Sequence, residues 1–163
     1  MKKVTNLLMF ICFAVALTSC STDNIEDHID DVNALVIPEA KPIEIEILEL
    51  INQHRISIGL NALDSHMLIK GQAFTHTDYM VDKNVVNHDN FFSRKSYLVN
   101  NANAIKVSEN VAYGFSSASS VVNAWLNSEG HRSNIEGDFT DFEISAELGE
   151  NNKWYFTNIF IKK

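Results

Sequence analysis

The sequence predicts a domain of the α/β or α+β class in which helices pack on a small sheet. Two segments repeat apolar residues at helical spacing, and a later segment alternates apolar with polar residues. The chain ends in two strand-like segments separated by a turn-forming stretch. Since predicted helices both precede and follow the alternating segment, we expect helices to cover the sheet.

The first predicted helix carries an apolar stripe. Ile47, Ile51, His54 and Ile58 recur at spacings of four, three and four residues. This spacing is typical of one helix face. Gly59 is placed where the helix should end. His54 falls on the stripe, so we expect a partly buried histidine with one hydrogen bond.

A second helix is predicted to start near Asp64 or Ser65, either of which can serve as the N-cap. Its apolar face holds Ile69, Ala73, His76 and Met80. Gly71 weakens the prediction, because glycine in a helix interior costs about 1 kcal/mol relative to alanine. Four matched positions outweigh that one glycine.

The middle of the domain combines loop, strand and helix. Residues 84–103 are rich in Asn and Ser and predict a loop with one short helix. Residues 107–113 alternate in the manner of a strand, with Glu109 on the apolar side. Residues 116–127 predict a further helix with an apolar stripe.

The C-terminal segment predicts a hairpin. Residues 141–148 and the aromatic stretch 154–161 are the expected strands, and residues 149–152 (GENN) are the expected turn. One domain from residue 43 to residue 163 contains all of these elements, and it shows no internal repeat.

The N-terminus predicts export as a lipoprotein. Lys2 and Lys3 precede an apolar run, residues 7–17, that is too short to span a bilayer. The sequence LTSC that follows resembles the lipobox cut by bacterial lipoprotein signal peptidase. We therefore expect residues 1–19 to be a signal peptide and Cys20 to carry the lipid that anchors the chain to a membrane. An ordinary signal peptide with a coincidental cysteine is the alternative.

The next segment predicts an acidic, flexible linker over residues 20–42. It contains both prolines of the chain and no sustained apolar period. A calcium loop is the alternative for its Asp-rich part, but the alternating ligands, central glycine and closing glutamate are missing. Ser21 replaces the aspartate often associated with inner-membrane retention, so we expect the outer membrane of a Gram-negative bacterial cell envelope.

Composition excludes several classes of function. The only other cysteine, Cys12, lies in the predicted signal peptide, which excludes a disulfide framework, a cysteine-rich zinc site and a cysteine nucleophile. Removing Lys2 and Lys3 with the signal peptide changes the formal net charge from −8 to −10. Nucleic acid is therefore not an expected partner. Residues 22–46 hold eight acids against Lys41 alone, which assigns most of the excess to the tether.

Three residues stand out as candidates for chemistry: His88, Glu109 and His131. A carboxylate on an apolar face persists only if it is paired, hydrogen-bonded or protonated, and two histidines are available as partners. Two imidazoles and a carboxylate would suit a divalent metal with an open position, or a general acid/base pair. The alternative is separate histidines with structural hydrogen bonds, because no local spacing forces the three together.

Six segments, in order and in register, resemble the signature segments of the CAP superfamily. This group comprises the cysteine-rich secretory, antigen 5 and pathogenesis-related 1 proteins, also called SCP-like, and the resemblance is to its cysteine-free bacterial form. The segments are LINQHR (50–55), AFTHTDYM (73–80), NHDNFFSR (87–94), SENVAYG (108–114), AWLNSEGHRSNI (124–135) and WYFTNIF (154–160). The resemblance extends from about residue 46 to residue 163.

The resemblance implies an α-β-α sandwich, a small central sheet with helices on both faces. It also implies a cleft where two histidines and two glutamates gather, able in some members to hold zinc or another divalent metal. His88, Glu109 and His131 match three of these positions. The family's second glutamate aligns with Ser128, so the adjacent Glu129 is only a candidate fourth member.

Two positions depart from the family pattern. Ser108 and Glu143 each stand where glycine is usual, and we expect the charge of Glu143 to narrow or recharge the nearby cleft. His76 matches a position that looks structural in the family, in agreement with its place on the apolar stripe.

These observations favour an envelope-anchored, non-catalytic binding module. Its cleft would recognise a small apolar, cell-wall or protein ligand. In one form of this hypothesis, His88 and His131 also hold a divalent metal in the cleft. One alternative is a zinc-assisted hydrolase of peptide or envelope polymer, with Glu109 as the general base. The other is a structural or interaction protein in which the three residues form a hydrogen-bonded network without an active cleft.

Overall fold

The computed structural model describes residues 35–163. In chain order its elements are α1 (Pro42–Ser57), β1 (Asp64–Ser65), α2 (Met67–Lys83), α3 (Phe91–Ala102), β2 (Lys106–Tyr113), α4 (Ala118–Leu126), α5 (Glu129–Ile135), β3 (Asp141–Leu148) and β4 (Trp154–Lys162). The predicted signal peptide, the predicted lipidation site Cys20 and most of the predicted linker lie outside the described residues. No helix within residues 35–163 combines the length and apolar character that a membrane crossing requires.

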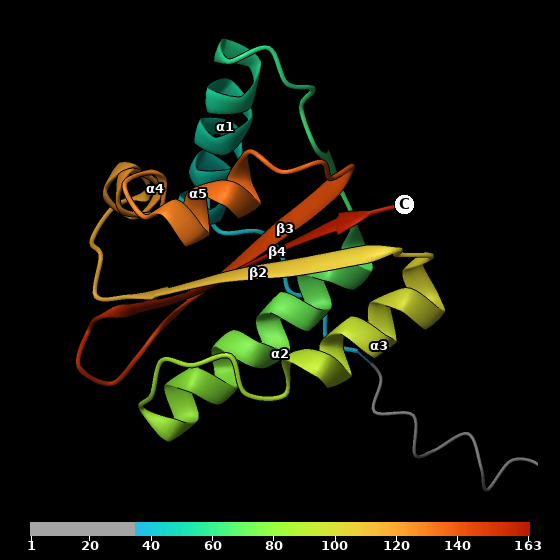
Figure 1. Cartoon of the computed structure of the whole chain (residues 1–163). Coiled ribbons are helices and arrows are strands. Elements are labelled where there is room, and N and C mark those ends of the chain that lie inside the picture. Colours follow the sequence, from blue (N-terminus) through green and yellow to red (C-terminus); the bar gives the residue numbers. More distant parts are fainter. Residues whose placement is uncertain (1–34) are drawn as a thin grey trace, which may run out of the picture. The chain divides into compact units, whose positions relative to one another are not determined.

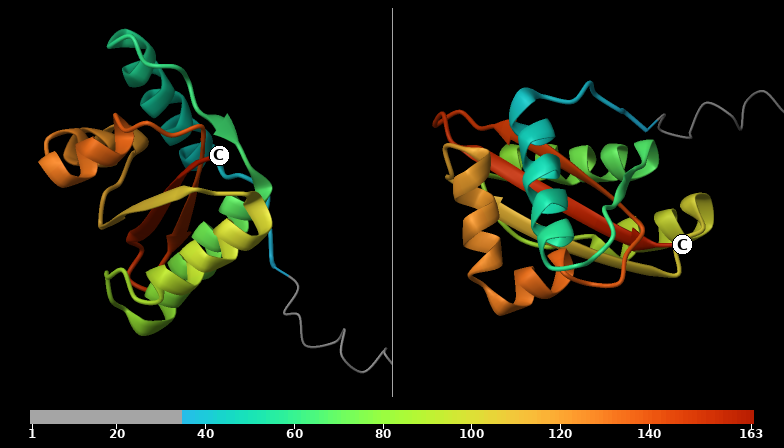
Figure 2. Two further views of the ribbon diagram at one scale, coloured as in Figure 1. Left: turned by 45° about the vertical axis from the view of Figure 1, so that its right-hand side comes forward. Right: turned by 90° about the horizontal axis from the view of Figure 1, so that it is seen from above.

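The sheet has four strands in the order β1-β3-β4-β2. β4 pairs antiparallel with both β2 and β3, and β1 pairs parallel with β3. Helices α1, α4 and α5 cover one face of this sheet, and α2 and α3 cover the other (Figure 1, Figure 2). The three layers confirm the predicted α+β class and the α-β-α sandwich.

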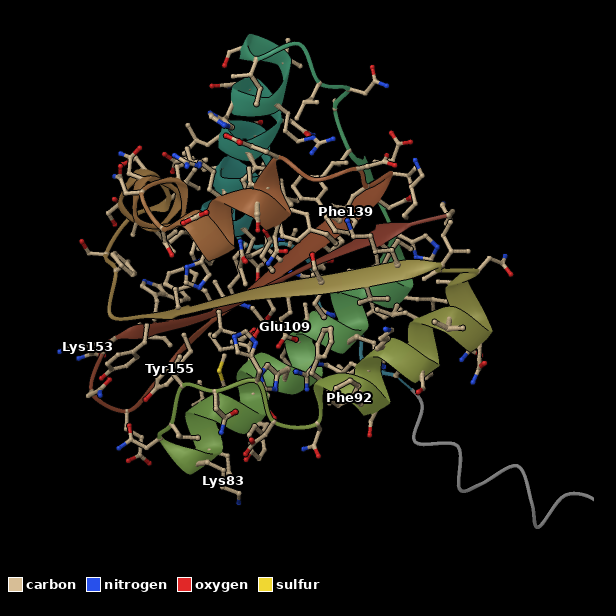
Figure 3. The ribbon with its side chains drawn as sticks, in the orientation of Figure 1. Lys83, Phe92, Glu109, Phe139, Lys153 and Tyr155 are labelled. Carbon is tan, nitrogen blue, oxygen red and sulfur yellow. The ribbon has the colours of Figure 1, made fainter. Side chains whose placement is uncertain are left out.

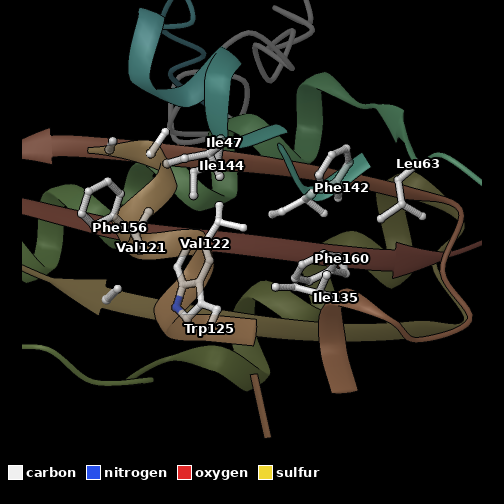
Figure 4. Close-up of a cluster of buried hydrophobic side chains, with 14 of the residues drawn as sticks. Ile47, Leu63, Val121, Val122, Trp125, Ile135, Phe142, Ile144, Phe156 and Phe160 are labelled. Carbon is white, nitrogen blue, oxygen red and sulfur yellow. The ribbon is translucent and has the colours of Figure 1, made fainter. Parts of the chain in front are cut away.

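The larger core lies between the sheet and the α1, α4 and α5 layer. Trp125 of α4 packs there with Ile47 of α1 and with Phe156 and Phe160 of β4 (Figure 4). Burying each of these side chains contributes about 1.5–3 kcal/mol. The indole Nε1–H of Trp125 also donates to the carbonyl oxygen of Val111 at 3.2 Å, which fixes α4 to β2.

A second core lies under the α2 and α3 layer. Ile69 and Ala73 of α2 pack with Leu98 of α3, Val107 of β2 and Ile159 of β4. The four residues predicted for the apolar face of this helix, which are Ile69, Ala73, His76 and Met80, are all buried. This part of the sequence prediction is confirmed.

The start of α2 differs from the prediction. Asp64 and Ser65 form β1 and do not cap the helix. The backbone N–H of Asp64 donates to the carbonyl oxygen of Thr140 at 3.0 Å, beside β3. The N-cap is His66, whose side chain accepts a bond from the backbone N–H of Leu68. Pairing with a distant strand therefore overrides the capping preference of Asp and Ser.

One helix was predicted in part, and another was missed. The short helix expected within residues 84–103 is α3, which is twelve residues long. Its core face carries Arg94 together with Leu98 and Ala102, so the apolar period is interrupted by a charge. The short α5, seven residues long, was not predicted at all.

The last part of the predicted linker, residues 35–41, lies against the domain. Leu35 packs on Gly71 in the interior of α2, where an added Cβ would stand 2.5 Å from the Leu35 Cγ. This close approach explains the glycine that weakens the helix prediction. Lys41 reaches β3, where its ammonium donates to the Glu147 carboxylate at 2.6 Å.

A buried ion pair joins α1 to α2 beside β3. Glu44 of α1 is 0% exposed and accepts the Lys70 ammonium of α2 at 2.6 Å and the Ala146 backbone N–H at 2.7 Å. The same carboxylate accepts the Lys41 backbone N–H at 2.7 Å. Glu44 therefore belongs to the core, not to the acidic tether with which the sequence grouped it.

Candidate functional site

The candidate site is built around Glu109, on the edge strand β2. The strand alternates, so Val107 and Glu109 face α2 and α3, whereas Asn110 and Ala112 face α4 and α5. Figure 3 shows Glu109 between β2 and α2. Its side chain is 1% exposed, which makes its hydrogen-bond partners decisive for the stability of the fold.

Arg94 of α3 holds the Glu109 carboxylate in a two-pronged ion pair. The guanidinium Nε donates to Oε2 and Nη2 donates to Oε1, both at 2.9 Å. The remaining Nη1 donates to the carbonyl oxygen of Asp89 at 2.6 Å. Burial lowers the pKa of Arg94, and the charge of Glu109 opposes that shift. The pair is therefore compensated inside the fold.

His88 connects this ion pair to solvent. Its Nδ1 lies 2.8 Å from Oε1 of Glu109, and its side chain is 52% exposed. Because a carboxylate can only accept hydrogen bonds, Nδ1 carries the proton. When the ring is neutral, its other nitrogen, Nε2, can accept a hydrogen bond.

His76 of α2 lies on the other side of the same carboxylate. Its Nε2 is 3.8 Å from Oε1 of Glu109 and donates to the carbonyl oxygen of Asn87 at 2.9 Å. Burial lowers the pKa of His76, partly offset by the charge of Glu109. Its buried position agrees with the structural role predicted for it, although it sits within the cluster.

His131 lies across the edge strand from this cluster. Its Nδ1 is 2.8 Å from the Ser128 hydroxyl, and its carbonyl oxygen accepts the Asn110 side-chain amide at 3.0 Å. Burial lowers the pKa of His131, and the neighbouring His88 lowers it further. The two histidines thus lie near enough to interact, but they are fixed to opposite faces of β2.

Asn134 joins α5 to β2 by hydrogen bonds. Its side-chain amide donates to Oδ1 of Asn110 at 2.8 Å and to the carbonyl oxygen of Glu109 at 3.3 Å. Hydrogen-bonded networks of this kind give a segment a fixed position. The short α5 is therefore held by polar contacts to β2, which its brief sequence does not reveal.

A small pocket opens beside this edge of the sheet. It has a volume of about 260 Å³ and is lined by His88, Phe91, Val107, Ser108 and Glu109. Phe91 and Val107 make its walls apolar. The hydroxyl oxygen of Ser108 is buried without a hydrogen-bond partner among residues 35–163. We call this pocket the cleft.

The four site residues named from the sequence meet only in part. The structure joins His88 to Glu109 and places His131 nearby on the opposite face of β2. Glu129 is exposed at the start of α5 and makes no side-chain hydrogen bond with residues 35–163. The arrangement gives Glu129 no part in the cluster.

Glu143 lies away from the cleft. Ile159 of β4 pairs with Glu109 on one side and with Glu143 on the other, so it stands between the two carboxylates. Glu143 accepts a hydrogen bond from the Ser65 hydroxyl, and burial raises its pKa. Its bulk therefore fills space near β1, whereas the sequence suggested an effect on the cleft.

A zinc centre in an enzyme uses three protein ligands and leaves one position for water. His88 and His131 each retain one ring nitrogen, but Glu109 is engaged by Arg94 and His88. Within residues 35–163 no three His, Cys, Asp or Glu side chains are placed to hold one metal ion. The described residues do not fit a three-ligand zinc centre.

Arg94 is the residue of the candidate site that sequence reasoning missed. A carboxylate expected on an apolar face needs a cationic partner, and the two histidines were taken as the candidates. Arg94 ends the segment NHDNFFSR that also contains His88. The interrupted apolar period of its helix was the available signal.

Comparison with known proteins gives one family match. The model of the cysteine-rich secretory protein family, CAP, matches residues 48–159. Among curated proteins, the uncharacterized membrane protein YlbC of Bacillus subtilis is 31% identical over 124 residues, covering 74% of this chain and 34% of YlbC. The uncharacterized protein YkwD of the same organism is 35% identical over 98 residues, covering 56% of this chain and 37% of YkwD. The chain spans about a third of the length of both relatives.

Solved structures share the fold. An outer surface protein of Borrelia burgdorferi superposes with a TM-score of 0.65 at 21% identity, covering 72% of this chain and 90% of its own. An extracellular protein from Bacillus anthracis with an SCP domain gives 0.63 at 27% identity, covering 77% of this chain and 45% of its own. The first of these likenesses is evidence for the fold alone.

Proposed function

Since the chain belongs to the cysteine-rich secretory protein (CAP) family, we propose that it is an exported, non-catalytic binding module of the cell envelope. Its cleft would recognise a small apolar, cell-wall or protein ligand. Export is supported by the predicted signal peptide and by the outer-surface and extracellular descriptions of its structural neighbours. Lipid anchoring through Cys20 in an outer membrane belongs to the same proposal.

The observation that carries the proposal is that both carboxylate oxygens of Glu109 already accept hydrogen bonds. Arg94 donates to both carboxylate oxygens and His88 donates to one of them. A general base must accept a proton from water or substrate. Glu109 would have to break a buried ion pair to do so, and it lies behind His88. The carboxylate is therefore better suited to orient His88 than to act on a substrate.

The oriented His88 gives the cleft one directional contact. Its Nε2 accepts a hydrogen bond when the ring is neutral, and Phe91 and Val107 supply apolar surface beside it. Ligand sites commonly combine apolar walls with a few placed polar groups. A ligand with an apolar portion and one hydroxyl or amide donor fits this combination.

Zinc-assisted hydrolysis has less support. His88 and His131 could supply two ring nitrogens, and the third ligand is missing among residues 35–163. A metal bound by the two histidines alone would be weakly held. Metal binding through His88 and His131 is therefore the less supported alternative, and calorimetry with zinc tests it.

The experiment is an NMR titration of residues 34–163, which form a compact unit by themselves. Muramyl dipeptide and 1-hexanol are the probes for the cell-wall and apolar classes. A saturable shift at His88 and Phe91 with either probe, lost in His88→Ala and kept in Glu129→Ala, supports the proposal. No shift at the cleft with either probe would contradict binding of these classes.

Turnover is the second readout. The same protein is incubated with a peptide library and with peptidoglycan, in the presence of zinc and then of a chelator. The proposal predicts no cleavage under either condition. Chelator-sensitive cleavage that Glu109→Gln abolishes would establish a hydrolase and contradict the non-catalytic assignment.

A further inference from the structure

A second concavity lies between α2 and α3, on the side of the α2 and α3 layer. It has a volume of about 370 Å³, and one stripe of each helix lines it. Gln72, His76 and Tyr79 come from α2, and Arg94 and Tyr97 come from α3. None of its lining residues also lines the cleft. We call it the interhelix groove.

Gln72 is the feature that points to a ligand. Its residue is 8% exposed, and its carboxamide makes no hydrogen bond with any residue from 35 to 163. The amide nitrogen and oxygen are not among the fully buried unpaired atoms, so they are accessible and can pair with a polar group of a ligand. The Gln72 side chain lines the interhelix groove, so a donor and an acceptor face a space that a bound molecule can fill.

His76 adds a second unpaired acceptor. Its Nε2–H donates to the carbonyl oxygen of Asn87 at 2.9 Å, which leaves the lone pair of Nδ1. The ring stacks on Tyr79 with centroids 5.8 Å apart and planes 14° apart. Tyr97 contributes an aromatic side chain from the facing helix. The groove thus has aromatic surface and hydrogen-bonding groups together.

Among residues 35–163, Arg94 is the one permanently charged residue that lines the groove. The Arg94 charge is balanced by the Glu109 carboxylate, whose oxygens it contacts at 2.9 Å. Burial lowers the pKa of His76, which favours the neutral ring. An ion placed there would lose hydration without gaining a free counter-charge. An uncharged ligand is therefore favoured.

We propose that the interhelix groove binds a small uncharged molecule with a planar aromatic ring and an amide or hydroxyl group. The ring would lie against Tyr79 and Tyr97, and the polar group would pair with Gln72. The volume lies within the range of roughly 300–1,000 Å³ seen for ligand pockets. This site is separate from the cleft and does not depend on the function proposed for the cleft.

Three probes of similar size test the proposal by NMR titration of residues 34–163. Benzamide has the planar ring and the neutral amide, benzoate has the same shape with a charge, and cyclohexanecarboxamide has the amide without the planar ring. We expect benzamide to shift the Gln72 side-chain amide and the Tyr79 and Tyr97 ring signals saturably. The expected Kd is on the order of 1 mM for a ligand of this size. Benzoate and cyclohexanecarboxamide should bind at least about fivefold more weakly.

Variants tie the signal to the groove. Gln72→Leu keeps the side-chain size and removes the amide, so benzamide affinity should fall at least about fivefold. Thr75→Trp, at the exposed rim of the groove, should abolish binding by filling the space. Asn123→Trp is the matched control on exposed α4 and should bind as the parent does. Circular dichroism and thermal unfolding check that each variant is folded.

The proposal fails if benzamide gives no saturable shift at Gln72. It also fails if Gln72→Leu and Thr75→Trp both bind benzamide like the parent, or if all three probes bind equally. Binding that is retained in His88→Ala but lost in Thr75→Trp separates this site from the cleft. Loss in His88→Ala alone would place benzamide in the cleft and would contradict the assignment.

Discussion

Two buried glutamates lie near opposite sides of the sheet, and their surroundings differ. Glu44, near β3, contacts the Lys70 ammonium and two backbone N–H groups, and the partly exposed Lys41 ammonium lies farther away, at 3.7 Å from Oε1. Glu109, on β2, contacts buried Arg94 and the half-exposed His88 beside a pocket. Both carboxylates are compensated. Of these two carboxylates, Glu109 has a half-exposed partner beside a pocket, and that combination makes its side of the sheet the candidate site.

Glu44→Ala should have the largest effect. It leaves the Lys70 ammonium buried with the Ile144 carbonyl oxygen as its remaining partner, and it strands the Ala146 N–H. Breaking a buried pair in this way costs about 3–5 kcal/mol. Urea denaturation measures the loss in the free energy of unfolding. Glu46→Ala, on an exposed position of the same helix, is the control and should change it by less than about 0.5 kcal/mol.

If Glu44→Ala loses less than about 1 kcal/mol, the β3 pair is not the structural element described here. The contrast between the two glutamates would then disappear. Equal losses in the free energy of unfolding for Glu44→Ala and Glu46→Ala would lead to the same conclusion.

Arg94→Met should have the next largest effect. Glu109 would lose its cationic partner but keep the hydrogen bond to His88, whose side chain is half exposed and hydrated. We expect a loss of about 2 kcal/mol in the free energy of unfolding. The double variant Arg94→Met/Glu109→Leu removes both charges and should recover at least half of the loss. Lys95→Met, exposed on the same helix, serves as the control.

A strictly additive loss in the double variant would contradict the ion pair. Arg94 would then stabilise the fold through packing alone, since a compensating charge pair requires coupling between its members.

The pH dependence of the free energy of unfolding tests the burial of His76. Burial lowers the pKa of His76 below the value of about 6.5 expected in the unfolded chain. The unfolded state therefore takes up the proton first, so stability is fully present above about pH 6.5 and falls as the pH decreases below it. His76→Gln should flatten this part of the profile. Thermal unfolding of parent and variant at pH 7.5 and 5.5 measures the difference, and identical profiles would contradict it.

His88→Ala should have a small effect on stability. Glu109 keeps both Arg94 contacts, and the removed side chain is half exposed, so we expect a loss of about 1 kcal/mol or less. A loss above about 3 kcal/mol in urea denaturation would make His88 a structural element like Lys70. The two sides of the sheet would then be equivalent.

Zinc gives the smallest expected signal. Two imidazoles without a third ligand predict no stoichiometric binding at micromolar zinc in calorimetry of residues 34–163. The His88→Ala/His131→Ala double variant should give the same heats as the parent. Stoichiometric binding that the double variant loses would establish a metal site and would reopen the hydrolase alternative.

Local sequence patterns predicted most of the fold. Alternation located β2, and the aromatic stretch located β4, because a half-buried strand repeats every two residues. The elements that were missed, β1 and α5, are too short to show a period. They are held by partners far along the chain, such as Thr140 for Asp64 and Asn110 for Asn134.

The candidate site was less predictable than the fold. His88 and Glu109 stood out on chemical grounds, but only the family resemblance predicted that they meet, since residues 21 positions apart have no local reason to do so. The Glu44–Lys70 pair left no sequence signal, because its members lie on different helices and Glu44 follows an acidic stretch. Tertiary packing decides which side of the sheet is open to a ligand. The local period of apolar residues does not show this.

The most direct test of the account follows both regions in one NMR titration with muramyl dipeptide and 1-hexanol. The signals observed are the His88 imidazole and the Lys70 ammonium. At least one probe is expected to shift His88 saturably, and neither probe should move Lys70, because the Lys70 and Glu44 side chains are both buried. An unmoved His88 with both probes, or equal shifts at His88 and Lys70, would contradict the claim that the cleft beside β2, and not the β3 side, binds these ligands.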